Sequence, residues 1–438
     1  MKNSEFIKYT PLLEKEPPKI LCFLFVLGVT VSALGDCGSL GSSAMYLKVV
    51  MGLCVAASIL YLFQVQNIKR LKLCGLFLIF FTIPIAFVLL ESLGLWSGKT
   101  MEFSYVSRGV QKMVFQAVTI ISAVAGAYML KAKTIDYYFI GLSIGNGLIL
   151  IIEFIKFGPT NVLTNFSGYL YKIEIHDITF CMGLFILYYI FVKPHIFNRI
   201  TFIAIAAFFF YMGLKRIALL SIGLSVVIGF ILLRLKPKAQ KIFVIIVGVL
   251  LVVLGYAFIV IITNGTFTEI MNEYEVDMAG RDKIYKYMAQ YYNLSPGYFG
   301  FGFEYTVSLL RAMKDSGTQI IHVTGIHNDI LKQYIELGFI GYFTWMIFVF
   351  IVQPLFYSKK FGSKAMIICM ITNIYAWCTY MTDNTIYYFF MSMTLRMMLI
   401  STACLSIENG TMQKISFTKK KLAKKLKLSQ VKKLVDKE

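Results

Sequence analysis

Acidic residues are scarce in this chain of 438 residues, and few long polar stretches interrupt its apolar blocks. Asp and Glu number 23 against 43 Lys and Arg, so the formal net charge is +20. In a soluble protein this excess would suggest a nucleic-acid partner, but no module that reads nucleic acid accompanies it, and we expect none to be bound. Hydrophobic residues make up 58% of the chain, whereas apolar residues make up roughly half of a soluble domain. The composition therefore favours a membrane protein.

The eight cysteines carry no functional pattern either. Their spacing fits neither a metal-binding motif nor a disulfide framework. Most of them lie inside apolar blocks, namely Cys22, Cys54, Cys74, Cys181, Cys369, Cys378 and Cys404. We therefore expect these side chains to pack within helices and to take no part in chemistry.

Apolar residues come in uninterrupted blocks long enough to cross a bilayer, which takes about 20 helical residues. The blocks predict about twelve transmembrane helices. They fall near 20–35, 44–63, 73–90, 106–130, 136–157, 178–192, 200–214, 217–233, 242–262, 337–357, 365–382 and 385–405. The predicted fold class is therefore all-α, a polytopic transmembrane helical bundle.

Basic residues between these spans predict the side of the membrane on which each loop lies. With the N-terminus inside, most of the Lys and Arg of the short loops fall on the cytoplasmic side, at Lys69, Arg70, Lys72, Lys131, Lys133, Lys193, Arg199, Arg234, Lys236, Lys238, Lys359, Lys360 and Lys364. The loops on the opposite side are poor in positive charge. We therefore expect a multi-pass protein in a lipid bilayer, with both termini in the cytoplasm.

One long polar segment, 263–336, separates two groups of spans and falls on the outer face. It divides the chain into a first bundle of spans (1–262), this outer segment (263–336), the last spans (337–405) and a basic cytoplasmic tail (406–438). Loops of such length usually carry function or structure of their own. The tail interleaves lysines with Leu and Val, which is typical of a segment held at an anionic membrane surface.

Within the outer segment we expect short helices at 281–293 and 304–314, and a third helix that opens near His327. A glycine-rich stretch, Ser295–Gly302, lies between the first two helices. No strand–helix unit surrounds this stretch, so its glycines indicate a turn and not a phosphate-binding loop.

Cationic side chains and a histidine gather on the predicted outer face. Lys215 and Arg216 occupy a short outer turn, where positive charge opposes the usual distribution, and Arg281 and His327 lie in the outer segment. Arginine donates several hydrogen bonds to phosphate and stays charged, so two arginines suit a diphosphate leaving group. Histidine titrates near neutrality and suits the removal of a proton from an attacking hydroxyl. The outer segment lacks a carboxylate pair flanked by histidines, so we invoke no metal ion and expect no cofactor.

Each of these residues also has a purely structural interpretation. Arg281 opens a charged run that fits a solvated helix face, and His327 precedes apolar residues at helical spacing, which is typical of a structural histidine. Lys215 and Arg216 would serve equally as anchors to lipid headgroups. Arg396 stands in the middle of a predicted span, where a charge needs a buried partner or a polar cavity.

The residues around His327 resemble the signature of the O-antigen polymerase/ligase superfamily. In that family a His-Asn pair precedes a Leu, then an acidic residue and two glycines that open the next span. The matching residues here are Gly325–Leu331 (GIHNDIL) and Glu336–Gly341 (ELGFIG). Upstream, Gly280-Arg281 and the stretch Pro296–Gly302 resemble the large outer loop of the same family.

A second patch, Gly213–Leu219 (GLKRIAL), resembles the short motif that this family carries between two spans. It departs from the family at Lys215, where the family often has Ser, and this leaves open which of Lys215 and Arg216 makes the contact to substrate. The topology is similar as well, since the long outer loop precedes the third-last span.

The resemblance implies a metal-independent, GT-C-like membrane glycosyltransferase of the bacterial cytoplasmic (inner) membrane. It would use an undecaprenyl-diphosphate-linked glycan on the outer face, with a lipid-linked oligosaccharide as donor and as acceptor. A flippase and a chain-length regulator of the same pathway are candidate partners. Carried over by residue, His327 is the catalytic base or orienter of the acceptor. The implied diphosphate-binding residues are Arg216, Arg281 and Lys215, with Asn328 and Glu336 in support.

The favoured function is a surface polysaccharide polymerase that joins repeat units of O-antigen or capsule. A ligase that moves the finished glycan to a lipid or wall acceptor shares the same motifs and stays open. A lipid-linked oligosaccharide flippase or other transporter is a rival of another class, although the chain shows no similarity between its halves. A non-enzymatic assembly or sensory protein would leave the arginines and the histidine without a shared site.

Overall fold

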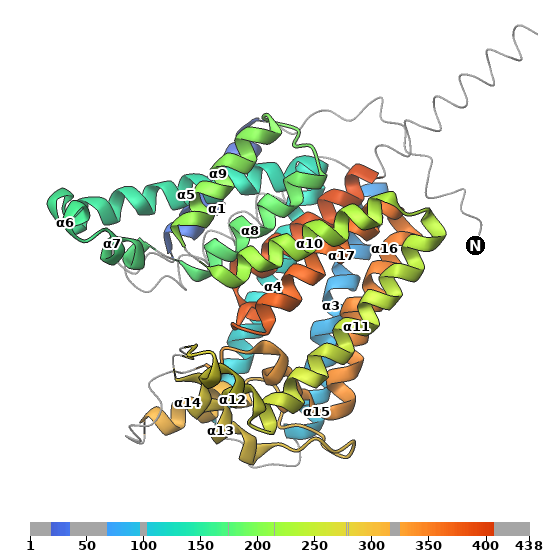
Figure 1. Ribbon diagram of the computed structural model, residues 1–438. Helices are drawn as coiled ribbons and strands as arrows, with labels where there is room; N and C mark the ends of the chain where they lie inside the picture. Colours follow the sequence, from blue (N-terminus) through green and yellow to red (C-terminus); the bar gives the residue numbers. More distant parts are fainter. Residues whose placement is uncertain are drawn as a thin grey trace, which may run out of the picture.

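The computed structural model describes residues 19–35, 68–96, 103–173, 175–213, 215–276, 278, 280–315 and 325–406. All regular secondary structure in these ranges is helical, which confirms the all-α class (Figure 1). The predicted span at 44–63 and the basic tail beyond 406 lie outside the described residues. The long helices are α1 (Lys19–Gly35), α3 (Ile68–Trp96), α4 (Phe103–Leu130), α5 (Thr134–Phe157), α8 (His176–Phe191), α9 (Arg199–Met212), α10 (Arg216–Arg234), α11 (Pro237–Thr263), α15 (Asp329–Ile347), α16 (Gln353–Phe361), α17 (Ser363–Tyr380) and a last helix over Phe389–Ser406.

Six stretches of the described chain are long and apolar enough to cross a membrane, so this is a multi-pass membrane protein. They are Leu73–Ser92, Lys112–Phe157, Arg216–Arg234, Pro237–Thr263, Asp329–Phe361 and Phe389–Ser406. Three shorter apolar helices, α1, α8 and α9, coincide with three more predicted spans. The stretch Lys112–Phe157 contains most of α4 and all of α5, which the 3-10 turn Lys131–Lys133 separates where an inner loop was predicted. The count of twelve spans stays a prediction.

Small residues allow α1 to run close beside α5 (Figure 1). An added Cβ at Gly141 would lie 2.7 Å from the Cβ of Val29, and one at Gly145 would lie 2.6 Å from the Cβ of Ala33. The hydroxyl of Thr30 donates a hydrogen bond to the carbonyl of Gly141 across this contact, at 3.1 Å. Close packing of this kind is a main source of helix association in a bilayer, where burial of apolar side chains gains little.

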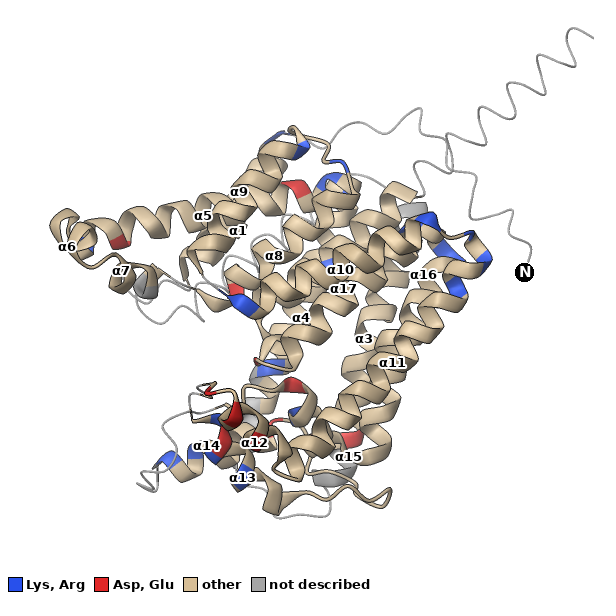
Figure 2. Cartoon of the chain, viewed as in Figure 1, with Lys and Arg blue, Asp and Glu red and all other residues tan. Residues whose placement is uncertain are grey.

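Charge is distributed unequally between the two ends of the bundle. Lys and Arg are concentrated around the turn between α10 and α11 and at the end of α16, whereas acidic residues are concentrated near α12 and α14 (Figure 2). Arg234 lies in the last turn of α10, Lys236 precedes α11, and Lys359 and Lys360 lie in the last turn of α16. This asymmetry is the one that the positive-inside rule predicts for a cytoplasmic end.

The outer segment folds into short helices at one end of the bundle (Figure 1). They are α12 (Thr266–Glu273), α13 (Arg281–Met288) with the 3-10 turn Ala289–Tyr291, and α14 (Tyr305–Asp315). The two short helices predicted from the sequence are thereby confirmed, whereas α12 was not predicted. The third helix, α15, begins at Asp329, ahead of the predicted start of the next span at 337.

Two glycines let the glycine-rich stretch pack against a break in α15. Gly338 interrupts the helix with φ 73°, and Gly300 has φ 81°, a region that side chains with a Cβ rarely adopt. The amide of Phe339 donates to the carbonyl of Tyr298 at 2.8 Å. An added Cβ at Gly300 would lie 2.5 Å from a backbone atom of the break, the carbonyl oxygen of Glu336. The turn predicted at Ser295–Gly302 is confirmed, and its glycines serve a close approach of two backbones.

Candidate functional site

The turn that precedes α15 places His327 at the end of the bundle where the segment 263–336 folds. His327 has φ 48°, an uncommon backbone conformation for a residue with a side chain. Asn328 caps the helix, since its Oδ1 accepts a hydrogen bond from the amide of Leu331 at 3.0 Å. The His-Asn pair is thus a strained residue followed by a helix cap, and Asn328 has a structural reason to be there.

The imidazole of His327 faces a buried carboxylate that no sequence motif indicated. Its Nδ1 lies 3.3 Å from Oδ1 of Asp383, and the two side chains are 31% and 9% exposed. The same Oδ1 accepts hydrogen bonds from the amide of Asn384 at 2.8 Å and from the hydroxyl of Tyr388 at 3.1 Å. Asp383 is therefore held in place, and it orients Nε2 of His327 away from the carboxylate.

The charge state of Asp383 follows from these contacts. Burial alone would raise the pKa of its carboxyl group, but hydrogen bonds from His327 and from the amide of Asn384 outweigh it. The positive fields of His327 and His176 act in the same direction. The pKa of Asp383 consequently lies below its ordinary value, and the group is ionised at neutral pH.

A second histidine contacts the predicted cationic turn, and its positive field reaches Asp383. His176 begins α8, and its Nε2 lies 3.3 Å from Nζ of Lys215, which directly precedes α10. Sequence reasoning missed His176, although a His-Asp pair that opens an apolar run beside an outer loop was a usable signal. The neighbouring Asp177 accepts hydrogen bonds from the amides of Phe390 at 2.8 Å and Met391 at 2.7 Å, and so fastens the last helix to α8.

Both predicted arginines lie at the first residue of a helix. Arg216 opens α10 and is exposed, and Arg281 opens α13 and is half-buried. Burial raises the pKa of Tyr285, one turn after Arg281, while the Asn328 side chain and the charge of Arg281 oppose the rise. Among the described residues, neither arginine forms an ion pair with a carboxylate.

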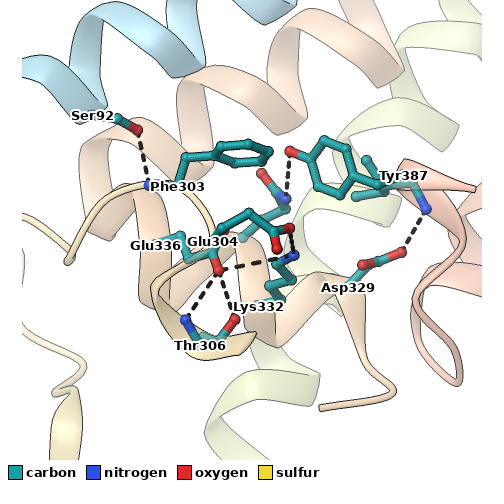
Figure 3. Close-up of polar contacts among 10 residues, drawn as sticks. Ser92, Phe303, Glu304, Thr306, Asp329, Lys332, Glu336 and Tyr387 are labelled. Atoms are coloured by element: carbon teal, nitrogen blue, oxygen red, sulfur yellow. Dashed lines mark hydrogen bonds and ion pairs between the residues drawn. The ribbon is translucent and has the colours of Figure 1, made fainter. Parts of the chain in front are cut away.

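Glu336 lies in a buried charged cluster and not in an open site (Figure 3). Its Oε1 accepts hydrogen bonds from the hydroxyl of Thr306 at 2.6 Å and from the amide of Thr306 at 3.3 Å. Nζ of Lys332 lies 4.0 Å from the same oxygen and 2.6 Å from Oε1 of Glu304. Glu336 thus stabilises the contact between α14 and α15.

Arg396 has the buried polar partners that its place in a span requires. Its guanidinium donates hydrogen bonds to the hydroxyl of Thr119 and to the side-chain oxygen of Gln116, both on α4. Gln116 in turn donates to the hydroxyl of Ser392 at 3.3 Å. The expectation of a buried partner for Arg396 is confirmed, and the partners are neutral.

The fold defines a multi-pass helical membrane protein, and the described contacts bring together two pairs of predicted or candidate site residues, His327 with Asp383 and His176 with Lys215. No contact of the described residues joins Arg216 to His327 or to Arg281. Residues 201–346 match the family model described as O-antigen ligase. This match supports the O-antigen polymerase/ligase superfamily that the motifs indicated, and the members of that family are membrane glycosyltransferase-like enzymes. No curated protein matches the chain.

Proposed function

We propose that this protein is a surface polysaccharide polymerase that joins undecaprenyl-diphosphate-linked repeat units on the outer face of the bacterial cytoplasmic membrane. The observation that carries the proposal is the pair of His327 and Asp383, whose carboxyl group also feels the positive field of His176, the partner of Lys215. A base held by a carboxylate suits the transfer of a sugar from a diphosphate to a hydroxyl.

In this reaction Nε2 of His327 removes the proton from the acceptor hydroxyl. The acceptor oxygen then forms a bond to the anomeric carbon of the donor sugar, and the bond from that carbon to the diphosphate oxygen breaks. Its electron pair leaves with the undecaprenyl diphosphate, whose charge Arg216, Arg281 and Lys215 stabilise. Asp383 stabilises the imidazolium that forms, and the mechanism needs no metal ion.

A ligase is the second candidate, because the family model that matches residues 201–346 carries that description. Polymerase and ligase differ in the acceptor, which is another lipid-linked repeat unit for the polymerase and a lipid or wall acceptor for the ligase. The residues of the proposed site act on the donor and on a hydroxyl, and both activities need them.

The proposal is tested with purified protein in lipid nanodiscs and synthetic undecaprenyl-diphosphate-linked repeat units. We expect longer glycans together with released undecaprenyl diphosphate. Growth only after a lipid or wall acceptor is added would make the protein a ligase. In liposomes, movement of the donor across the bilayer without glycan growth would make it a transporter and overturn the proposal.

A further inference from the structure

A buried ion pair joins Lys332 of α15 to Glu304, the residue before α14 (Figure 3). Nζ of Lys332 is 2.6 Å from Oε1 of Glu304, and the two side chains are 4% and 0% exposed. The ammonium group also lies 4.9 Å from the ring centroid of Tyr387. A charge at this depth is costly to bury unless its geometry and partners are fixed, so the pair holds α14, α15 and the ring of Tyr387 together.

Two neighbours of Lys332 on α15 form hydrogen bonds to the short turn Thr385–Tyr387, which contains the ring of Tyr387. Oδ2 of Asp329 accepts a hydrogen bond from the amide of Ile386 at 2.7 Å. The side-chain amide of Gln333 donates to the hydroxyl of Tyr387 at 3.3 Å. Positions 329, 332 and 333 share one face of a helix, so a single surface of α15 binds the whole turn.

This turn lies between the two residues that hold the proposed base. Asp383 precedes it and faces His327, while Tyr388 follows it and donates to Asp383. A shift of Thr385–Tyr387 would therefore move Asp383 and change the orientation of the imidazole of His327.

Backbone strain at two points supports a functional purpose for this arrangement. Glu304 has φ 64° and His327 has φ 48°, so a residue in the left-handed region stands at each end of the network. Strained residues persist only where the surrounding contacts hold them, and they cluster at functional sites.

We propose that Glu304, Lys332 and Asp329 form a positioning network that fixes the Thr385–Tyr387 turn and, through Asp383, the orientation of His327. The inference rests on the proposed function, in which His327 is the base. These three residues touch neither donor nor acceptor. Their loss should slow transfer while the arginines still bind the donor.

The experiment compares Asp329→Ala with Asp329→Asn, because the asparagine side-chain oxygen still accepts the amide of Ile386. We expect Asp329→Ala to lower kcat about 10- to 100-fold with little change in KM for the donor, as for other residues that orient a functional side chain. Asp329→Asn should stay within about threefold of wild type. The matched control is Asp136→Ala, since Asp136 is a buried carboxylate that accepts a backbone amide, that of His195, at 2.6 Å in a loop that joins other spans.

The ion pair is tested by a double-mutant cycle of Glu304→Gln and Lys332→Met. Each single change leaves an uncompensated buried charge, so we expect each to cost more in kcat than the double variant does. Every variant is checked by thermal unfolding and by its elution as a single species. Hydrogen exchange of the backbone amides of the segment 383–388 is a measurement that does not depend on activity. The exchange rate should rise in Asp329→Ala but not in Asp329→Asn.

Three results would overturn the network. They are an unchanged kcat in folded Asp329→Ala, an equal loss in Asp136→Ala, or hydrogen exchange of 383–388 that is the same in Asp329→Ala as in wild type. If Asp329→Ala does not fold, the double-mutant cycle decides, and a double variant that loses at least as much kcat as the two single changes together would overturn the network. A wild-type protein without transfer activity would instead reject the proposed function, and the exchange data would still test whether Asp329 fixes the turn.

Discussion

Nδ1 of His327 lies 3.3 Å from Oδ1 of Asp383, 56 residues further along the chain. The carboxylate fixes the ring through one nitrogen and leaves the other directed away from it. A histidine on the surface of an apolar helix would have no such partner, so this contact favours the functional interpretation of His327 over the structural one.

Replacement of His327 by Ala should abolish transfer and leave donor binding largely intact. The reason is that a base acts on the acceptor hydroxyl, whereas the arginines bind the diphosphate. The measurement is glycan growth together with the affinity for a lipid-linked repeat unit in nanodiscs. Growth at the wild-type rate would remove His327 from the mechanism.

Asp383→Asn keeps the shape of the side chain and removes its charge. We expect the transfer rate to fall about 10- to 100-fold, because the imidazolium loses its stabilising carboxylate. The pKa of Asp383 is lowered, so the group is charged throughout the neutral range and the loss should be present at pH 7 and at pH 8 alike. Glu273→Gln, an exposed change at the end of α12, is the control and should leave the rate unchanged.

Arg281→Lys retains the charge but loses the planar fork of hydrogen-bond donors. If Arg281 binds the diphosphate, activity should fall by about an order of magnitude or more, because the lysine stabilises the diphosphate leaving group less well. Arg311→Lys, an exposed change on α14 in the same outer segment, is the matched control. Equal behaviour of the two variants would leave Arg281 as part of a solvated helix face.

Labelling of single cysteines tests the predicted topology. Exposed Ser295 is a suitable position in the segment 263–336. In a background without the native cysteines, Ser295→Cys should react with a membrane-impermeant maleimide in intact cells. Lys238→Cys, in the first turn of α11, should react only after permeabilisation. The reverse pattern would invert the whole assignment and contradict an outer-face reaction.

Gly338→Ala should destabilise the protein by about 1–3 kcal/mol, because its backbone has a positive φ and an added Cβ would collide with the backbone of Phe299. Gly75→Ala on α3 is the matched control, since an added Cβ there meets nothing within 4 Å. Thermal unfolding in detergent measures both variants. Equal unfolding temperatures would show that the break in α15 does not need glycine.

Local residue patterns determined much of this protein. The apolar blocks specify helices of membrane-spanning length, Asn328 caps a helix whose start was predicted, and Gly338 and Gly300 mark places where only glycine fits. The short helices of the outer segment follow from the same kind of signal. Propensity, capping and periodicity act over a few residues, so they can be read along the chain.

Tertiary packing decided the partners of the site. Nothing local to His327 indicates Asp383, and nothing local to Lys215 indicates His176, which lies 39 residues before it. The buried pair of Lys332 and Glu304 was likewise not predictable, because a lysine and a glutamate are usually surface residues, and only the packing of the helices buries them here. Contacts between distant residues depend on how the helices pack, and that packing follows from the sum of many weak interactions across the whole bundle and not from any short stretch of sequence.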